Sequence, residues 1–98
     1  MKKISFPLKQ GSHGDAVANL QTGLRLILER GALRLGEADR QAYAKYVSGE
    51  QMQQFYGDTT AKVVAIFQEQ NRLKPGGDVD EPTAAALNKL LTELGAFP

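Results

Sequence analysis

A chain of 98 residues can form one domain around a single modest core, and it leaves little room for a deep active-site cavity. With 42% hydrophobic and 23% charged residues, its composition is ordinary for a globular protein. The net charge of +1 gives no support to nucleic-acid binding, and the absence of cysteine excludes disulfides and thiolate chemistry.

The N-terminal Met-Lys-Lys resembles the start of a signal peptide, but no apolar region of about 7 residues follows it. No stretch approaches the roughly 20 apolar residues that span a membrane. We therefore expect neither a signal peptide nor a membrane span. We expect residues 1–98 to form one domain, as an N-terminal module of a larger protein.

Residues 1–14 are expected to be extended, because Pro7 and the turn-forming sequence GSHG interrupt any regular element. The first helix is predicted over residues 15–30. Its apolar residues recur at offsets that place them on one helical face: Val17, Leu20, Leu24, Ile27 and Leu28. Gly31 is expected to end this helix, since glycine takes the left-handed conformation freely.

The second helix is predicted over residues 58–72. Asp58, or one of the two threonines after it, can accept hydrogen bonds from the free amides of the first turn. Val63 and Phe67 form an apolar pair four residues apart. Asn71 is expected to take the left-handed conformation at the exit.

The third helix is predicted over residues 81–94. Asp80 is the expected N-cap, and Pro82 lies in the first turn, where its missing amide costs nothing. One apolar face follows, and Gly95 ends the helix.

Residues 32–55 are less regular. The sequence GEADRQAYAKYV predicts a short helix that presents Ala42, Tyr43, Tyr46 and Val47. The sequence SGEQMQQFYG predicts another turn or two, starting at Ser48 or Gly49. No β-branched alternation occurs anywhere in the chain, so a sizeable sheet is not expected.

The three helix starts repeat one pattern, in which a glycine or aspartate turn precedes a polar cap and an apolar stripe. Three short amphipathic helices cannot each hide a stripe from water alone, but together they can close one core. We therefore predict an all-α fold. It is expected to be a compact three-helix bundle with an internal-duplication pattern and an extra, helical insertion at about 32–55.

No catalytic or metal-binding set of residues stands out. His13 is the only histidine, and a zinc site needs three or four convergent ligands. A glycosidase would need two paired carboxylates, but the acidic residues lie at helix starts, where capping accounts for them: Asp58, Asp78, Asp80 and Glu81. The serines lack a histidine partner. We predict a non-enzymatic protein without cofactor or metal.

Five polar or aromatic side chains allow both a binding and a structural interpretation. Gln21 and Gln68 could contact a glycan or peptide, but hydrogen bonding to neighbouring loops is the favoured interpretation. Tyr43 and Tyr46 could stack on a sugar, although closing a small local core is favoured. Tyr56, at a helix start, is expected to pack.

Three segments resemble the motifs of the peptidoglycan-binding-like domain, in order. The segment LKQGSHGDAVANLQTGL resembles the first motif, in Leu8, Gly11, Gly14, Val17, Leu20, Gln21 and Leu24. The segment YGDTTAKVVAIFQEQNRL resembles the second, in Tyr56, Gly57, Thr60, Val63, Phe67, Gln68 and Leu73. The segment GDVDEPTAAAL resembles the third, in Gly77, Val79, Asp80, Thr83 and Leu87.

The resemblance covers most of the chain outside residues 32–55, where this sequence is longer than is usual in the family. It implies a compact three-helix module, built from a rough internal duplication and typically attached to cell-wall hydrolases. A similar domain occurs in the prosegments of matrix metalloproteinases. The family's usual role is non-catalytic binding of bacterial cell-wall peptidoglycan, which would place this chain in the cell wall, in the periplasm or outside the cell.

We therefore expect a module that binds the glycan or stem peptide of peptidoglycan and anchors a larger protein. The ligand-binding residues are expected to be Tyr56, Asp58, Gln68 and Arg72, around a shallow groove near the helix starts. The alternative is a structural or protein-protein interaction module without glycan affinity. An exposed apolar patch over residues 32–55 would favour this alternative, and an open polar groove lined by Tyr56 would favour glycan binding.

Overall fold

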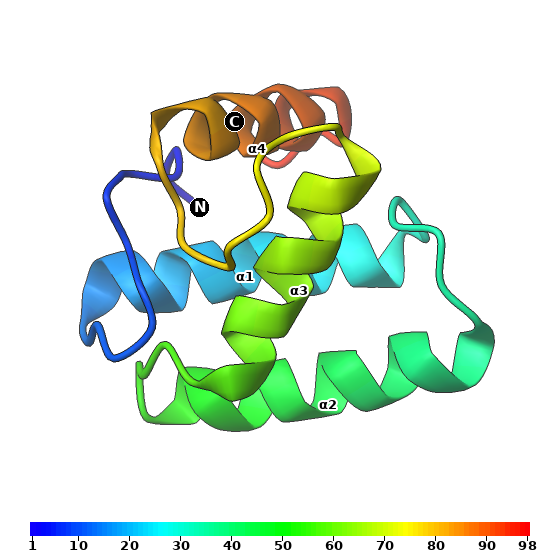
Figure 1. Cartoon of the computed structure of the whole chain (residues 1–98), viewed down its shortest axis with the longest axis horizontal. Helices are drawn as coiled ribbons and strands as arrows, with labels where there is room; N and C mark the ends of the chain where they lie inside the picture. Colours follow the sequence, from blue (N-terminus) through cyan, green and yellow to red (C-terminus); the bar gives the residue numbers. More distant parts are fainter.

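The computed structural model describes all 98 residues and contains four α-helices and no strand (Figure 1). The helices are α1 (Asp15–Glu29), α2 (Glu37–Met52), α3 (Asp58–Gln70) and α4 (Glu81–Glu93). The predicted all-α class is confirmed. None of these helices is both long and apolar enough to cross a membrane.

The helix α2 lies beside α1 and runs in the opposite direction. Near the end of α1, the Arg40 guanidinium at the start of α2 donates to Leu28 O at 3.4 Å. Near the start of α1, the amide of Gln51 at the end of α2 donates to Ala18 O at 3.0 Å. In Figure 1, α3 crosses over this pair and α4 lies on the side of α1 away from α2.

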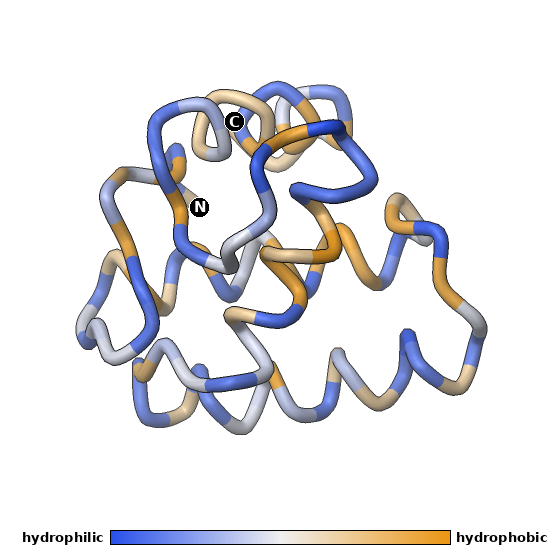
Figure 2. Tube along the Cα trace, in the orientation of Figure 1, coloured by the Kyte–Doolittle hydropathy of each residue, from blue (hydrophilic) through white to orange (hydrophobic).

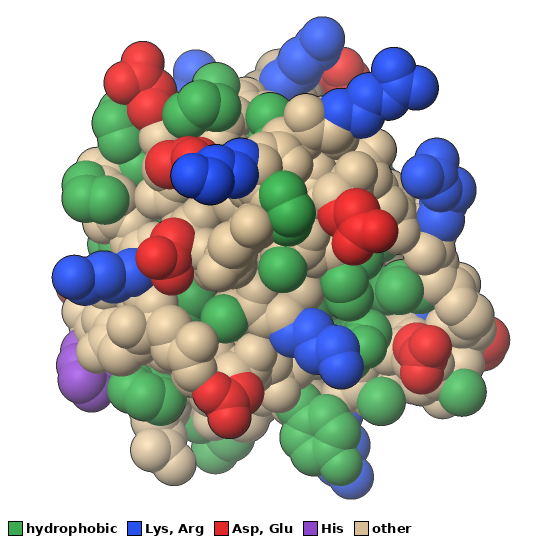
Figure 3. Space-filling view, in the orientation of Figure 1, with side chains coloured by type: hydrophobic (Ala, Val, Ile, Leu, Met, Phe, Trp, Pro, Cys, Tyr) green, Lys and Arg blue, Asp and Glu red, His purple; other side chains and the backbone are tan.

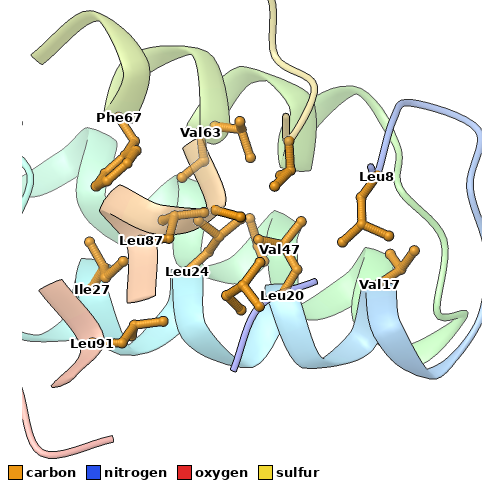
Figure 4. Close-up of a cluster of buried hydrophobic side chains, with 14 of the residues drawn as sticks. Leu8, Val17, Leu20, Leu24, Ile27, Val47, Val63, Phe67, Leu87 and Leu91 are labelled. Carbon is orange, nitrogen blue, oxygen red and sulfur yellow. The ribbon is translucent and has the colours of Figure 1, made fainter. Parts of the chain in front are cut away.

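The core consists of 17 buried hydrophobic residues, and all five residues of the predicted α1 stripe belong to it. Full burial of one such side chain contributes roughly 1.5–3 kcal/mol. Figure 4 labels the central part of the core: Leu8, Val17, Leu20, Leu24, Ile27, Val47, Val63, Phe67, Leu87 and Leu91. Helix α2 supplies only Val47 to it, and Figure 2 shows α2 as a largely hydrophilic segment.

Residues 32–55 hold one continuous helix of 16 residues, where two shorter pieces were expected. The expected start of a second piece at Ser48 or Gly49 is wrong, because the helix runs through both residues to Met52. Glycine inside a helix costs about 1 kcal/mol relative to alanine, and α2 tolerates that cost. Tyr46 does not close a local core, since 58% of it is exposed.

Side-chain amides pin the extended N-terminal segment to two helices. Asn19 of α1 accepts from Lys2 N at 3.0 Å and donates to Lys2 O at 2.8 Å. Asn88 of α4 accepts from Ile4 N at 2.7 Å and donates to Ile4 O at 3.1 Å. Each amide makes both backbone hydrogen bonds of one residue, as a neighbouring β-strand would, so the segment is held in place without a sheet.

The residues predicted to end α1 and to cap α4 are confirmed, whereas the residue predicted to end α3 differs. Gly31 takes a φ of +67°, as expected. Asp80 caps α4, because its carboxylate accepts from Thr83 N at 3.0 Å. At the end of α3, however, the left-handed residue is Arg72 and not Asn71. Asn71 instead donates its side-chain amide to Phe67 O at 2.8 Å.

The Gly77→Ala substitution is expected to lower the free energy of unfolding by about 2 kcal/mol or more. Gly77 has a φ of +84°, and an added Cβ would lie 2.8 Å from the backbone oxygen of Ala61. The left-handed conformation alone costs an L-residue about 1–2 kcal/mol. Gly76→Ala is the matched control, because nothing lies within 4 Å of its Cβ position. Urea denaturation of both variants checks the prediction, and equal losses would contradict it.

Candidate functional site: the groove between α2 and α3

An open groove of about 470 Å³ lies between the second half of α2 and the start of α3. It is lined by Lys45, Tyr46, Gly49, Glu50, Gln53, Phe55 and Thr59. Tyr46, Gly49 and Gln53 are three and four residues apart, so they lie along one face of α2 and its C-cap residue, Gln53. Gly49 has open space where a Cβ would stand, which leaves room beside the Tyr46 ring.

The carboxylate of Glu50 closes the inner side of the groove and caps α3. It accepts from Gly57 N at 3.1 Å, from Thr59 N at 3.0 Å and from Thr60 N at 2.9 Å. It also accepts from the Thr60 hydroxyl at 2.6 Å. These are free amides of the first turn of α3, which have no partner within the helix. A Cβ at residue 57 would lie 2.6 Å from Glu50 Oε2, so a side chain there would displace the carboxylate from these amides.

The predicted cap of α3 is therefore wrong. Neither Asp58 nor a threonine side chain caps this helix. The Asp58 carboxylate instead accepts a hydrogen bond from the Gln10 side chain. Sequence reasoning misses Glu50 because the cap comes from the preceding helix, seven residues before Gly57, and N-cap rules consider only the adjacent residue.

The electrostatics of Glu50 favour its ionised form. Partial burial raises the pKa of the carboxyl, but the hydrogen bonds from Thr60, Thr59 and Gly57 outweigh burial and leave the pKa below its ordinary value. The carboxylate is an anion placed at the positive end of the α3 dipole.

Four polar groups at the groove make no hydrogen bond within the protein. They are Lys45 Nζ, the Tyr46 hydroxyl, the Gln53 side-chain amide and Thr59 Oγ1. Phe55, also in the lining, is half-buried, and its ring packs on His13 with ring centres 5.1 Å apart. The groove thus combines an exposed aromatic ring with donors and acceptors that are available to a ligand.

The four residues expected to bind ligand do not line this groove or any other pocket. Tyr56 is fully buried, and its hydroxyl donates to Gly77 O. Burial, with the negative charge of Asp78 adding to it, raises the Tyr56 pKa above its ordinary value. Asp58 and Arg72 are exposed, but they lie at opposite ends of α3, roughly 20 Å apart along its axis.

Gln68 is also buried and makes four hydrogen bonds. Its Nε2 donates to Asp78 O at 2.7 Å and to Thr83 Oγ1 at 3.0 Å. Its Oε1 accepts from Gly76 N at 3.0 Å and from Gly77 N at 2.9 Å. The groove expected around Tyr56 and Gln68 is thus replaced by packed, hydrogen-bonded structure.

Gln21 repeats half of this arrangement. Its Nε2 donates to Phe55 O at 2.8 Å and to Thr60 Oγ1 at 3.0 Å. In both cases the glutamine Nε2 donates to the hydroxyl of a threonine in the first turn of a helix. It also donates to the backbone carbonyl five residues before that threonine. The structural interpretation of Gln21 and Gln68 is confirmed. The two glutamines differ at the side-chain oxygen. Gln21 Oε1 is buried and has no protein partner, whereas Gln68 Oε1 accepts two hydrogen bonds.

Charged groups elsewhere do not converge. No group of three or more histidine, aspartate or glutamate side chains is placed to hold a metal ion. Figure 3 shows positive and negative side chains interspersed over one face of the molecule, without a band of one sign.

Little in the sequence indicates the groove. Among its lining residues, the sequence offers only Tyr46 as a possible ligand contact. The 3-and-4 spacing of Tyr46, Gly49 and Gln53 is a usable signal, but it has meaning only once residues 37–52 form one helix.

Gln68→Met is expected to lower the free energy of unfolding by about 2–4 kcal/mol, and Gln21→Met by about half as much. The first change removes four hydrogen bonds, two of them fully buried, and the second removes two together with an oxygen that has no partner. Urea denaturation measures both. Equal losses would show that Gln21 Oε1 is as well satisfied as its counterpart.

Glu50→Gln is expected to lower the free energy of unfolding by about 1–2 kcal/mol at neutral pH, because it removes a charged cap. Since the folded pKa of Glu50 is depressed, its stabilisation is complete above the ordinary glutamate pKa of about 4.3. The stabilisation is lost as the pH falls through the lower folded value. The difference from the wild type should therefore shrink in acid.

Denaturation at a series of pH values between neutral and strongly acidic checks this. Glu69→Gln is the control, since that exposed carboxylate makes no side-chain hydrogen bond. A Glu50→Gln difference that stays constant with pH would contradict the capping role.

Comparison with known proteins does not assign a function to the groove. No family model, no curated protein and no solved structure matches the chain.

Proposed function

We propose that the chain is a non-catalytic binding module of the peptidoglycan-binding-like type, which anchors a larger protein to bacterial cell-wall peptidoglycan. In this proposal α1, α3 and α4 form the three-helix unit of the family, and α2 is the inserted helix. The resemblance of three sequence motifs in order is one support.

The paired amide bridges are a second support, because they have the form expected of an internal duplication. Gln21 donates to Thr60 and to the segment before it, and Gln68 donates in the same way to Thr83 and to the segment before it. Leu8 pairs with Val79, and the backbone of Tyr56 pairs with Gly11 and Ser12, so the lead-in contacts both helix starts. The motif residues thus serve one repeated construction.

The observation that carries the proposal is the open groove between α2 and α3. It presents the Tyr46 ring together with polar groups that have no protein partner. An open groove suits a segment of an extended polymer better than a small molecule, which is usually enclosed. Such a module acts by raising the local concentration of its parent protein at the polymer.

A protein-protein interaction module is the second candidate, and the exposure of Met52 favours it. Met52 is 86% exposed on the same helix as Tyr46. The two residues are six positions apart, so they point about 120° away from each other around the helix axis. They do not form one continuous apolar patch, which is why polymer binding is the better-supported proposal.

Co-sedimentation of the purified chain with isolated, protein-free peptidoglycan tests the proposal at low and moderate salt. We expect retention that survives moderate salt, because the groove carries little net charge, and that disappears after muramidase digestion. No retention in either salt would overturn wall binding.

A further inference from the structure

The groove offers an aromatic platform that nothing in the protein uses. Tyr46 is 58% exposed, and its hydroxyl makes no hydrogen bond within the protein. Single exposed aromatic residues are common on protein surfaces and do not by themselves mark a site. Here, however, the unpaired groups of Gln53 and Thr59 lie in the same groove.

These groups match the chemistry of a saccharide. A pyranose ring has an apolar face that can lie on a tyrosine ring, and hydroxyl or acetamide groups at its edge. The Gln53 amide can both donate and accept, and so can the Thr59 hydroxyl. Together they can satisfy a ligand that carries both kinds of group.

The charges of the groove disfavour an anionic ligand. The amides at the start of α3 would otherwise be a ready anion site. Glu50 already occupies them, and it contributes a negative charge to the groove lining. Lys45 is the single cation of the lining and Glu50 its single anion, so the lining carries no net charge. A carboxylate or phosphate would therefore meet as much repulsion as attraction.

We infer that the α2–α3 groove binds an uncharged saccharide, with the sugar ring stacked on Tyr46 and its polar edge on Gln53 and Thr59. Within the proposed function, on which this inference rests, the module holds the glycan strand of the wall and not its acidic stem peptide. The inserted helix α2 is then the element that makes the site.

Gly49 provides a test that does not depend on losing the fold. It lies in the groove beside Tyr46, and nothing stands within 4 Å of its Cβ position. Gly49→Gln adds a side chain in that space, and it also replaces glycine inside a helix by a better helix former. The variant should be at least as stable as the wild type while its groove is filled.

The experiment is an NMR titration of the ¹⁵N-labelled chain with a neutral N-acetylglucosamine tetrasaccharide and, separately, with a free stem pentapeptide. We expect the saccharide to shift the amide signals of Gly49, Gln53 and Thr59, and the peptide to shift none of them. Tyr46→Ala and Gly49→Gln should each weaken saccharide binding by about tenfold or more. Met52→Ala changes a still more exposed residue outside the groove and should leave saccharide binding unchanged.

The outcomes separate this inference from the proposed function. Shifts with the peptide alone, or no shift with the saccharide, would overturn the inference. Wall retention that Tyr46→Ala and Gly49→Gln leave unchanged would also overturn it, while the wall-binding proposal would stand. Saccharide binding in the groove without retention on peptidoglycan would support the inference and reject the proposed function.

Discussion

The carboxylate of Glu50 is the contact on which the arrangement of three helices depends. It belongs to α2, it caps α3, and it accepts the hydrogen of the Thr60 hydroxyl. Since that hydrogen is used, the Thr60 oxygen is free to accept from Gln21 Nε2 of α1. The chain of donors therefore runs in one direction, from α1 through α3 to α2, and each group has the partner that its chemistry requires.

A second charge on α2 acts at the opposite end. The Arg40 guanidinium donates to the last carbonyls of α1, Leu28 O and Glu29 O, at 3.4 and 3.3 Å. A cation at a helix C-terminus and an anion at a helix N-terminus both complement the helix dipole. Helix α2 thus stabilises the ends of both neighbours, although Val47 is its only buried residue. A helix with a single buried residue can in this way be joined to its neighbours through polar contacts as well as apolar ones.

This mode of attachment explains how the groove can exist. A helix held by a broad apolar stripe turns much of its surface toward the core. Because α2 buries only Val47 and is also held by Arg40, Glu50 and Gln51, Tyr46 on the helix and Gln53 at its C-cap stay exposed at the groove. Glutamine serves two purposes here. Buried Gln21 and Gln68 bind loops, whereas Gln53 lies in the groove with its amide unpaired.

The α1 stripe, the Asp80 cap and the left-handed turn at Gly31 could all be predicted from the sequence, because each depends on residues within one or two helical turns of one another. The structural role of the two buried glutamines followed from the versatility of an amide. The cap of α3 could not be predicted, because Glu50 reaches it from another helix. The groove likewise exists only where α2 meets α3, and a linear sequence contains no record of which helix faces pack together. Local order was therefore determined by short-range hydrogen bonds and periodicity, and the candidate site was decided by the tertiary contacts that bring Glu50 to the start of α3 and leave Tyr46 outside the core.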